Sequence, residues 1–214
     1  MPGYQPKPEQ IRWIKAAAFA LCLLPFLRLA WRAFAGTLGV NPIETITHST
    51  GWWALAFLLI TLAVTPLRRL LQWPWLLRLR RMFGLFAFFY ACVHFSIWLV
   101  FDHFFDWPAI LADIVKRPYI TVGFTAFVLM IPLAATSTNA MVRRLGATQW
   151  QRLHRFVYPI ALLGVLHFLW LVKKDIREPM VFVAILATLL GARVAHRLWQ
   201  KRAAPAATAR SPAA

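Results

Sequence analysis

The stretch MFGLFAFFYACVHFSIWLVF, residues 82–101, contains no charged side chain over its whole length. As an α-helix it would be about 30 Å long, which is the thickness of the hydrocarbon core of a bilayer. Apolar runs of similar length precede and follow it in the chain. Because every backbone polar group must find its partner inside lipid, helices are favoured over an open sheet. The sequence therefore predicts an all-α, polytopic membrane protein.

Six membrane-spanning helices are expected from these apolar runs. The chain is 60% hydrophobic and only 14% charged, which is more apolar than a soluble domain. Residues 1–202 are predicted to form one six-helix domain, and the Ala- and Pro-rich tail at 203–214 is predicted to be disordered. The expected spans are 14–34, 50–67, 82–101, 120–135, 156–172 and 179–198.

The charges fall at the ends of the spans, with a strong bias to one side. The net charge of +17 does not indicate nucleic-acid binding, because the cations form no patch on a soluble domain. Positive residues favour the cytoplasmic side, so both termini are predicted to lie inside (N-in/C-in). Six of the seven acids fall on the opposite side: Glu44, Asp102, Asp106, Asp113, Asp175 and Glu178. The cations expected inside are Lys7, Arg12, Lys15, Arg68, Arg69, Arg78, Arg80, Arg81, Arg143, Arg144, Arg152, Arg155, Arg193, Arg197, Lys201, Arg202 and Arg210.

Two histidines, His94 and His167, lie deep inside predicted spans. Counted from the inner ends of their helices, they lie about 18 Å and about 17 Å into the membrane. An imidazole in hydrocarbon is costly unless it is hydrogen-bonded or bound to a metal. Two imidazoles at one depth suit the axial positions of a haem between two helices. The alternative is a pair of core histidines bonded to nearby backbone or hydroxyl groups.

His154 is a third candidate ligand, about 20 Å nearer the inner side than His167. A second haem would need a ligand at about this depth. The matching position on the third span holds Arg80 and Arg81 rather than a histidine, so a second imidazole is missing there. The alternative is an interfacial histidine that caps a helix or contacts lipid.

Three further residues at the outer side are candidates for binding a cofactor. His48, at the expected start of the second span, could contact a cofactor edge, a quinone or a partner, or could be ordinary helix-start chemistry. Arg28 and Arg32, one turn apart on the first span, could pair with haem propionates. Snorkelling of both arginines to the outer interface is the competing interpretation.

The chain resembles the MsrQ family, the haem-binding membrane subunits of the bacterial periplasmic methionine sulfoxide reductase system. This family lies within the wider superfamily of ferric-reductase-like membrane domains. The resemblance covers nearly the whole chain. The segments that carry it are Arg80–Leu85, His94, Lys116–Gly123, Thr136–Thr138, Arg144–Gly146, Trp150, Leu153–Tyr158, His167 and Trp170.

The resemblance implies an electron-transfer subunit of the bacterial inner membrane, with one or two b-type haems and FMN. It implies that His94 and His167 hold the outer haem and that His154 matches a further family histidine proposed for a second haem. The partner it implies is a periplasmic molybdopterin-dependent catalytic subunit that reduces methionine sulfoxide in proteins. No motif in the sequence defines an FMN site.

The source of electrons must lie outside this chain, because it has no GxGxxG run that opens a helix and no room for a nicotinamide domain. Quinol or a separate cytoplasmic flavin reductase is the expected donor. A proton-coupled or small-solute transporter is the alternative function, but such proteins usually carry acids within their spans. An intramembrane metallohydrolase lacks its HExxH motif here.

Overall fold

A computed structural model describes residues 4–172 and 174–208, with side chains described through residue 202. Six of its helices are long and apolar enough to cross a membrane, and the described residues contain no strand. The predicted class, an all-α polytopic membrane protein, is confirmed. The six spans are Pro8–Phe34, Pro42–Leu71, Pro74–Asp102, Pro118–Ala135, Ala147–Leu171 and Arg177–Arg202.

Every span lies where it was expected, but most begin earlier than hydropathy indicated. Pro8, Pro42 and Pro118 open three of the helices, since the fixed φ of proline suits a first helical turn. The helices are α1 (Pro8–Phe34), α2 (Pro42–Leu71), α3 (Leu77–Ile97), α4 (Trp107–Lys116), α5 (Pro118–Ala135), α6 (Asn139–Leu145), α7 (Ala147–His154), α8 (Val157–Leu171) and α9 (Arg177–Thr208). A 3₁₀ turn (Pro74–Leu76) precedes α3, and a π-helical turn (Trp98–Asp102) follows it.

Hydropathy did not predict the short helices α4, α6 and α7, because they are not apolar spans. Helix α9 reaches Thr208, so the first residues of the predicted disordered tail have helical backbone. The rest of that tail, residues 209–214, lies outside the described residues.

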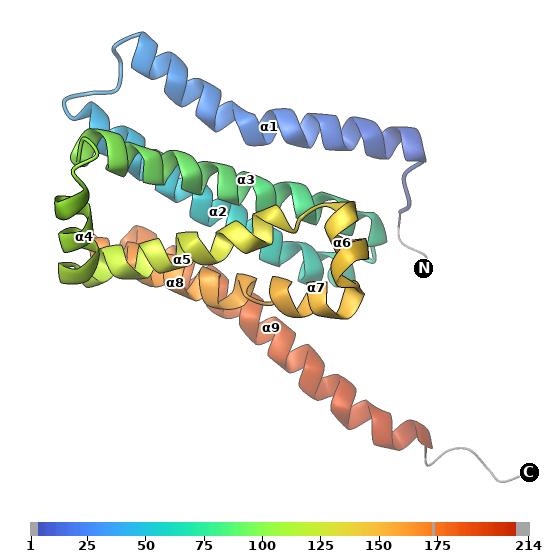
Figure 1. Cartoon of the computed structure of the whole chain (residues 1–214). Coiled ribbons are helices and arrows are strands. Elements are labelled where there is room, and N and C mark those ends of the chain that lie inside the picture. The colour runs from blue at the N-terminus through green and yellow to red at the C-terminus, as the bar shows by residue number, and fades with distance from the viewer. Residues whose placement is uncertain (1–3, 173, 209–214) are drawn as a thin grey trace, which may run out of the picture.

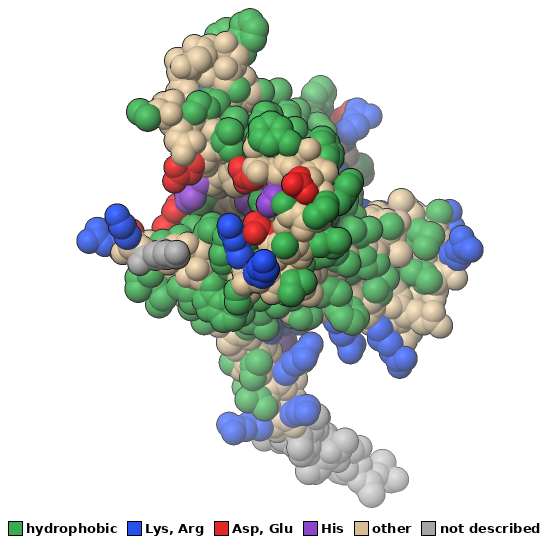
Figure 2. Space-filling view, turned by 60° about the vertical axis from the view of Figure 1, so that its left-hand side comes forward, with side chains coloured by type: hydrophobic (Ala, Val, Ile, Leu, Met, Phe, Trp, Pro, Cys, Tyr) green, Lys and Arg blue, Asp and Glu red, His purple; other side chains and the backbone are tan. Residues whose placement is uncertain are grey.

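Two helix pairs form the centre of the bundle: α2 packs along α3, and α5 packs along α8 (Figure 1). Helix α1 flanks α3, while α9 contacts α2 and α8 and then inclines away. Many basic residues lie in the helix turns at the end where α6 and α7 lie, such as Arg68 and Arg69 in the last turn of α2 and Arg143 and Arg144 in that of α6, so we call it the basic end. The opposite end, where α4 lies, we call the acidic end. Figure 2 looks towards the acidic end and shows acidic side chains beside histidines.

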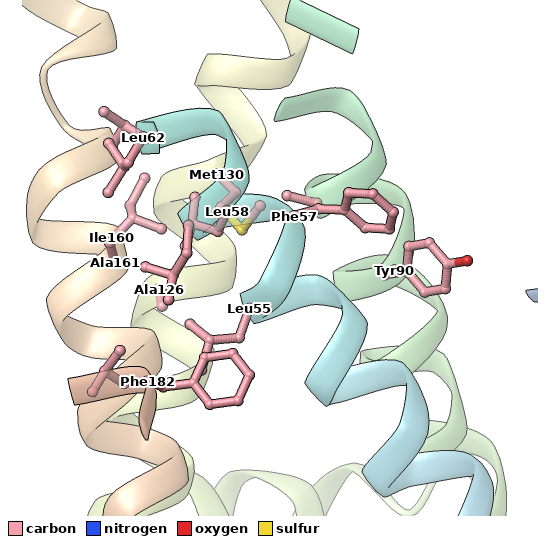
Figure 3. Packing of buried hydrophobic residues seen from close by; sticks show 14 of the residues in the cluster. Leu55, Phe57, Leu58, Leu62, Tyr90, Ala126, Met130, Ile160, Ala161 and Phe182 are labelled. Carbon is pink, nitrogen blue, oxygen red and sulfur yellow. The ribbon is translucent and has the colours of Figure 1, made fainter. Parts of the chain in front are cut away.

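Helix α2 occupies the middle of the bundle, and its buried residues pack against four neighbouring helices. Figure 3 shows its residues Leu55, Phe57, Leu58 and Leu62 directed at the neighbouring helices. Leu62 is fully buried. The partners that surround them are Tyr90 of α3, Ala126 and Met130 of α5, Ile160 and Ala161 of α8, and Phe182 of α9. The small alanines let α5 and α8 approach each other closely, as small residues do in membrane bundles.

A buried arginine supplies a hydrogen bond that α2 lacks at a proline. Pro66 has no N–H, so the carbonyl of Leu62, four residues earlier, loses its helical partner. Arg193 of α9 donates a hydrogen bond to this carbonyl from Nη2. Its Nη1 donates to Leu189 at 3.0 Å, and its guanidinium lies 5.6 Å from the centre of the Tyr158 ring. This contact fastens α9 to α2 inside the bundle.

A tyrosine plays a similar part at the proline of α1. Pro25 interrupts this helix, and the hydroxyl of Tyr90 inserts beside it. The hydroxyl accepts from the N–H of Phe26 at 3.0 Å and donates to the carbonyl of Cys22 at 2.9 Å. These two backbone groups would otherwise bond to each other in a regular helix. Tyr90 is only 1% exposed, so it ties α1 to α3 in a dry environment.

Candidate metal centre between two histidines

The imidazole of His94 lies in a notch of α2 that only a glycine leaves open. A Cβ on Gly51 would lie 3.0 Å from Cε1 and 3.1 Å from Nδ1 of His94. The same nitrogen lies 3.0 Å from the carbonyl oxygen of Thr47, one turn earlier on α2. The hydroxyl of Thr50 lies 3.5 Å away and is already engaged with carbonyls of its own helix. Helix α2 thus holds the ring from one side and sets its orientation.

The imidazole of His167 is held by α5 in the same way. A Cβ on Gly123 would lie 2.5 Å from Nδ1 and 2.8 Å from Cε1 of His167. Nδ1 lies 2.7 Å from the carbonyl oxygen of Tyr119, which is again four residues before the glycine. Each helix pair therefore uses one device, in which a glycine admits the ring and the carbonyl one turn earlier bonds its Nδ1.

These contacts determine which ring nitrogen is left for a ligand. A carbonyl oxygen can only accept, so the Nδ1 of each neutral imidazole carries the proton. The lone pair then resides on Nε2, and no partner for either Nε2 is found among the described residues. Histidines that bind metals usually donate their other ring N–H to a carbonyl in this manner, which fixes the tautomer and the ring orientation. The alternative interpretation was a pair of core histidines that are satisfied by hydrogen bonds. In the described residues, hydrogen bonds engage Nδ1 of each ring but not Nε2.

The two rings lie side by side between the helix pairs, an arrangement that agrees with their predicted equal depth. Their centroids are 6.2 Å apart, and the ring planes are inclined by 79°. If a metal lies about 2.0 Å from each nitrogen, and each ring centre about 1.1 Å further, two opposed imidazoles sharing one ion have centroids about 6.2 Å apart. The separation therefore fits one shared metal ion.

The donor set also limits what kind of metal could be held. In the parts of the chain that the structure describes, no three His, Cys, Asp or Glu residues gather closely enough to hold an ion. A metal bound by His94 and His167 would thus need its remaining ligands from a cofactor, and a porphyrin supplies four. The residues present fit a six-coordinate haem better than a bare ion.

Ion pairs at the acidic end hold the outer ends of the helices that support this pair. Asp113 of α4 lies 3.2 Å from His103 Nε2, just beyond α3, and 3.2 Å from Nε of Arg117, at the start of α5. The side chains of His103 and Asp113 are largely buried. These contacts join the end of α3, which carries His94, to the first turn of α5, where Tyr119 supports His167.

His154 lies at the C-terminal end of α7, away from the paired imidazoles. Its Nε2 is 3.0 Å from the hydroxyl of Thr136, and its ring stacks on Trp150 with centroids 3.9 Å apart. The indole N–H of Trp150 in turn donates to the Thr136 carbonyl at 2.9 Å. His154 and His167 do not lie on one uninterrupted helix, because α7 ends at His154 and α8, which contains Pro159, begins at Val157. A proline at 159 cannot donate to the carbonyl of Arg155, which favours the break.

The remaining candidates lie at the acidic end and are separately engaged. His48 lies in the second turn of α2, not at its start, because Asn41 caps this helix. Its Nε2 is 3.4 Å from Glu178 at the start of α9, and both side chains are half exposed. Arg32 donates to the carbonyl of Thr37 at 3.0 Å, in the turn after α1, and Arg28 is exposed. The structure does not bring these arginines to the two imidazoles.

Sequence reasoning identified the two imidazoles that the structure brings together, but not the glycines that hold them. Gly51 and Gly123 were not singled out, although each ends a segment quoted for other reasons, Thr47–Gly51 and Lys116–Gly123 respectively. A usable signal was present, since a glycine inside a predicted helix often marks the close approach of another group.

Comparisons with known proteins bear on the same part of the chain. The family model described as "Ferric reductase like transmembrane component" matches residues 50–165. A protein of Herminiimonas arsenicoxydans is 59% identical over 204 residues, covering 94% of this chain and 93% of its own length. One from Azospira oryzae is 52% identical over 210 residues, covering 95% and 90%, and one from Ralstonia nicotianae is 53% identical over 196 residues, covering 91% and 90%. Each of the three is named protein-methionine-sulfoxide reductase heme-binding subunit MsrQ.

Proposed function

Because the chain belongs to the MsrQ family, the haem-binding subunits of protein-methionine-sulfoxide reductase, we propose that it holds a haem b between His94 and His167 and carries electrons across the membrane. It is a multi-pass membrane protein with the helical architecture of a redox membrane subunit. The observation that supports the proposal best is the 6.2 Å spacing of two imidazoles whose Nδ1 atoms both bond to carbonyls.

The chain contributes position and environment to this chemistry. When bound, the haem supplies an iron that accepts and releases one electron at a time. Thr47 and Tyr119 hold the ligand rings through their carbonyls, and Gly51 and Gly123 let these rings lie against the helices. Phe168 of α8 belongs to the apolar core and packs against His48 and Phe182. A dry shell and a fixed ring orientation are two means by which a protein sets a redox potential.

The direction of electron flow is proposed from the charge bias and the family. The basic end would face the cytoplasm, with quinol or a cytoplasmic flavin reductase as donor. The acidic end would face the periplasmic side of the bacterial inner membrane. The electron acceptor there would be a molybdopterin-dependent catalytic subunit. His94 and His167 are nearer to this end, since Thr47 and Tyr119 lie close to the starts of α2 and α5. The acceptor would therefore dock at the acidic end, and His48 and Glu178 would be near it.

Further cofactor contacts are proposed beside the haem between His94 and His167. A second haem at His154 would require the Thr136 hydroxyl to leave Nε2, or coordination through Nδ1. Arg28 and Arg32 of α1 are proposed to pair with haem propionates. FMN is proposed from the family alone.

The proposal is tested by the absorbance of the purified protein. Protein from haem-replete cells is expected to show a reduced-minus-oxidised b-haem spectrum. His94→Ala and His167→Ala should each abolish this spectrum while the helical content is retained. His196→Ala is the matched control, because His196 contacts Trp199 on α9 and takes no part in the pair. A colourless folded wild type, or an unchanged spectrum in either ligand variant, would contradict the proposal.

A further inference from the structure

Helices α1 and α3 enclose a groove at the basic end that no part of the proposed electron pathway uses. Its volume is about 450 Å³, within the range of about 300–1,000 Å³ typical of small-molecule sites. Lys15, Phe19 and Leu23 of α1 line one wall. Arg78, Arg81, Met82, Leu85, Phe86 and Phe89 of α3 line the other.

Both walls follow the same order from the basic end inwards. On α1, Lys15 is followed at intervals of four residues by Phe19 and Leu23, so the three share one helix face. On α3, the cations Arg78 and Arg81 come first, and the lining beyond them is apolar or aromatic. The groove thus has a cationic mouth and an apolar interior.

The depth of the groove matches one leaflet of a bilayer. From Lys15 to Leu23 the rise is about 12 Å, and from Arg78 to Phe89 it is about 16 Å. The hydrocarbon core is about 30 Å thick, so the groove ends near its midplane. Phe19 and Phe86 contact each other edge-on, with ring centroids 5.1 Å apart, where the two walls meet.

The cations at the mouth have no acidic partner among the described residues. The described residues form four ion pairs, and all four lie at the acidic end: His48–Glu178, His103–Asp113, Arg117–Asp113 and Arg177–Asp175. Arg81 donates to the amide oxygen of Asn139 at 2.6 Å, which leaves its positive charge uncompensated. The three cations at the mouth of the groove therefore lack a counter-ion among the described residues.

We infer that this groove binds an anionic phospholipid, whose phosphodiester lies between Lys15, Arg78 and Arg81 and whose acyl chain runs along Phe19, Leu23 and Phe89. Basic pockets between membrane helices bind anionic head groups in this way. A neutral amphiphile would fill the apolar interior of the groove but would not compensate the positive charge at its mouth. A free phosphate would compensate this charge but leave the apolar interior empty. The bound lipid would also fill space between α1 and the bundle. The inference does not depend on the proposed haem.

The test uses the full chain in mild detergent, stripped of lipid and titrated with phosphatidylglycerol or phosphatidylcholine under native mass spectrometry. One phosphatidylglycerol should bind more tightly than phosphatidylcholine. Lys15→Gln/Arg78→Gln should weaken this binding about thirtyfold, from about 1 kcal/mol for each basic residue at the membrane surface. Arg143→Gln/Arg144→Gln removes the same charge from exposed positions outside the groove and should leave the affinity within about twofold of wild type.

A second variant addresses the apolar interior and does not alter the charge. Leu85→Trp places a larger side chain in the channel and should reduce phosphatidylglycerol binding while all three cations remain. Equal affinity for both lipids, equal weakening in the two charge variants, or unchanged binding in Leu85→Trp would overturn the inference. Displacement of the lipid by inorganic phosphate or by FMN at equal concentration would also overturn it, because the site would then belong to a soluble anion.

Discussion

The imidazole of His167 occupies the space that a side chain at position 123 would take. Nδ1 of His167 lies 2.5 Å from the point where a Cβ on Gly123 would be, closer than any real Cβ contact. His94 and Gly51 repeat this relationship on the other helix pair, with a shortest separation of 3.0 Å. The positions of the two imidazoles therefore depend on the absence of a Cβ at Gly51 and Gly123 as well as on the helices that carry the histidines.

Gly123→Ala should remove the proposed haem. The added methyl group forces the His167 ring away from the carbonyl of Tyr119, and both its tautomer and its position are lost. We expect the b-haem absorbance per chain to fall more than about tenfold, since loss of a support of a ligand costs about 10- to 100-fold in affinity. Gly191→Ala is the control, because a Cβ there meets open space on α9. Full haem content in Gly123→Ala would show that His167 is not held as described.

Gly51→Ala should have a milder effect than Gly123→Ala. Here the ring of His94 needs to move by only a few tenths of an ångström to relieve the contact. We expect haem to be retained but its midpoint potential and low-spin electron paramagnetic resonance signals to shift, because the ring orientation changes. The two measurements are made on the same purified sample. Identical spectra and potentials in Gly51→Ala and wild type would count against the notch in α2.

Tyr90→Phe should loosen the docking of α1. Its hydroxyl bridges Cys22 and Phe26 beside Pro25, and removing it leaves a buried donor and acceptor imperfectly paired. We expect a loss of about 1–3 kcal/mol in the free energy of unfolding, measured by denaturation in mixed micelles. Thr188→Ala is the control, since the hydroxyl of Thr188 bonds only within α9, to the carbonyl of Ala184. Equal stability of Tyr90→Phe and wild type would contradict the bridging role.

Arg193→Met should weaken the contact between α9 and α2. We expect the free energy of unfolding to fall by about 1.5–3 kcal/mol, the usual strength of a hydrogen bond from a charged group. The reason is that the carbonyl of Leu62, deprived of its helical partner by Pro66, loses the hydrogen bond that Arg193 donates in its place. The same denaturation measurement applies.

Pro66→Ala provides a direct check on this explanation. Alanine restores the N–H that bonds the Leu62 carbonyl within α2, so Arg193→Met should cost less in the Pro66→Ala background than in wild type. If the cost of Arg193→Met were the same in both backgrounds, the guanidinium would not be compensating for the proline.

The fold class and the two principal histidines could be predicted from the sequence alone. Hydrophobicity acts on each segment independently, so a charge-free run such as 82–101 indicates a span without any knowledge of its neighbours. Depth within a span is also a local quantity, since it is a count of residues along one helix. For this reason His94 and His167 could be placed level before any contact was known.

Which helix faces meet was decided only by the tertiary structure. The notches at Gly51 and Gly123, the bond from Arg193 to the Leu62 carbonyl and the break between His154 and Val157 all depend on a second helix or on local backbone geometry. The carbonyl bonds that hold the two imidazoles and the bond from Arg193 each pair a donor with an acceptor 47 to 131 positions away in the chain. Hydropathy and residue counting carry no information about such pairs, because in lipid the facing sides of two helices are as apolar as the sides that face the membrane.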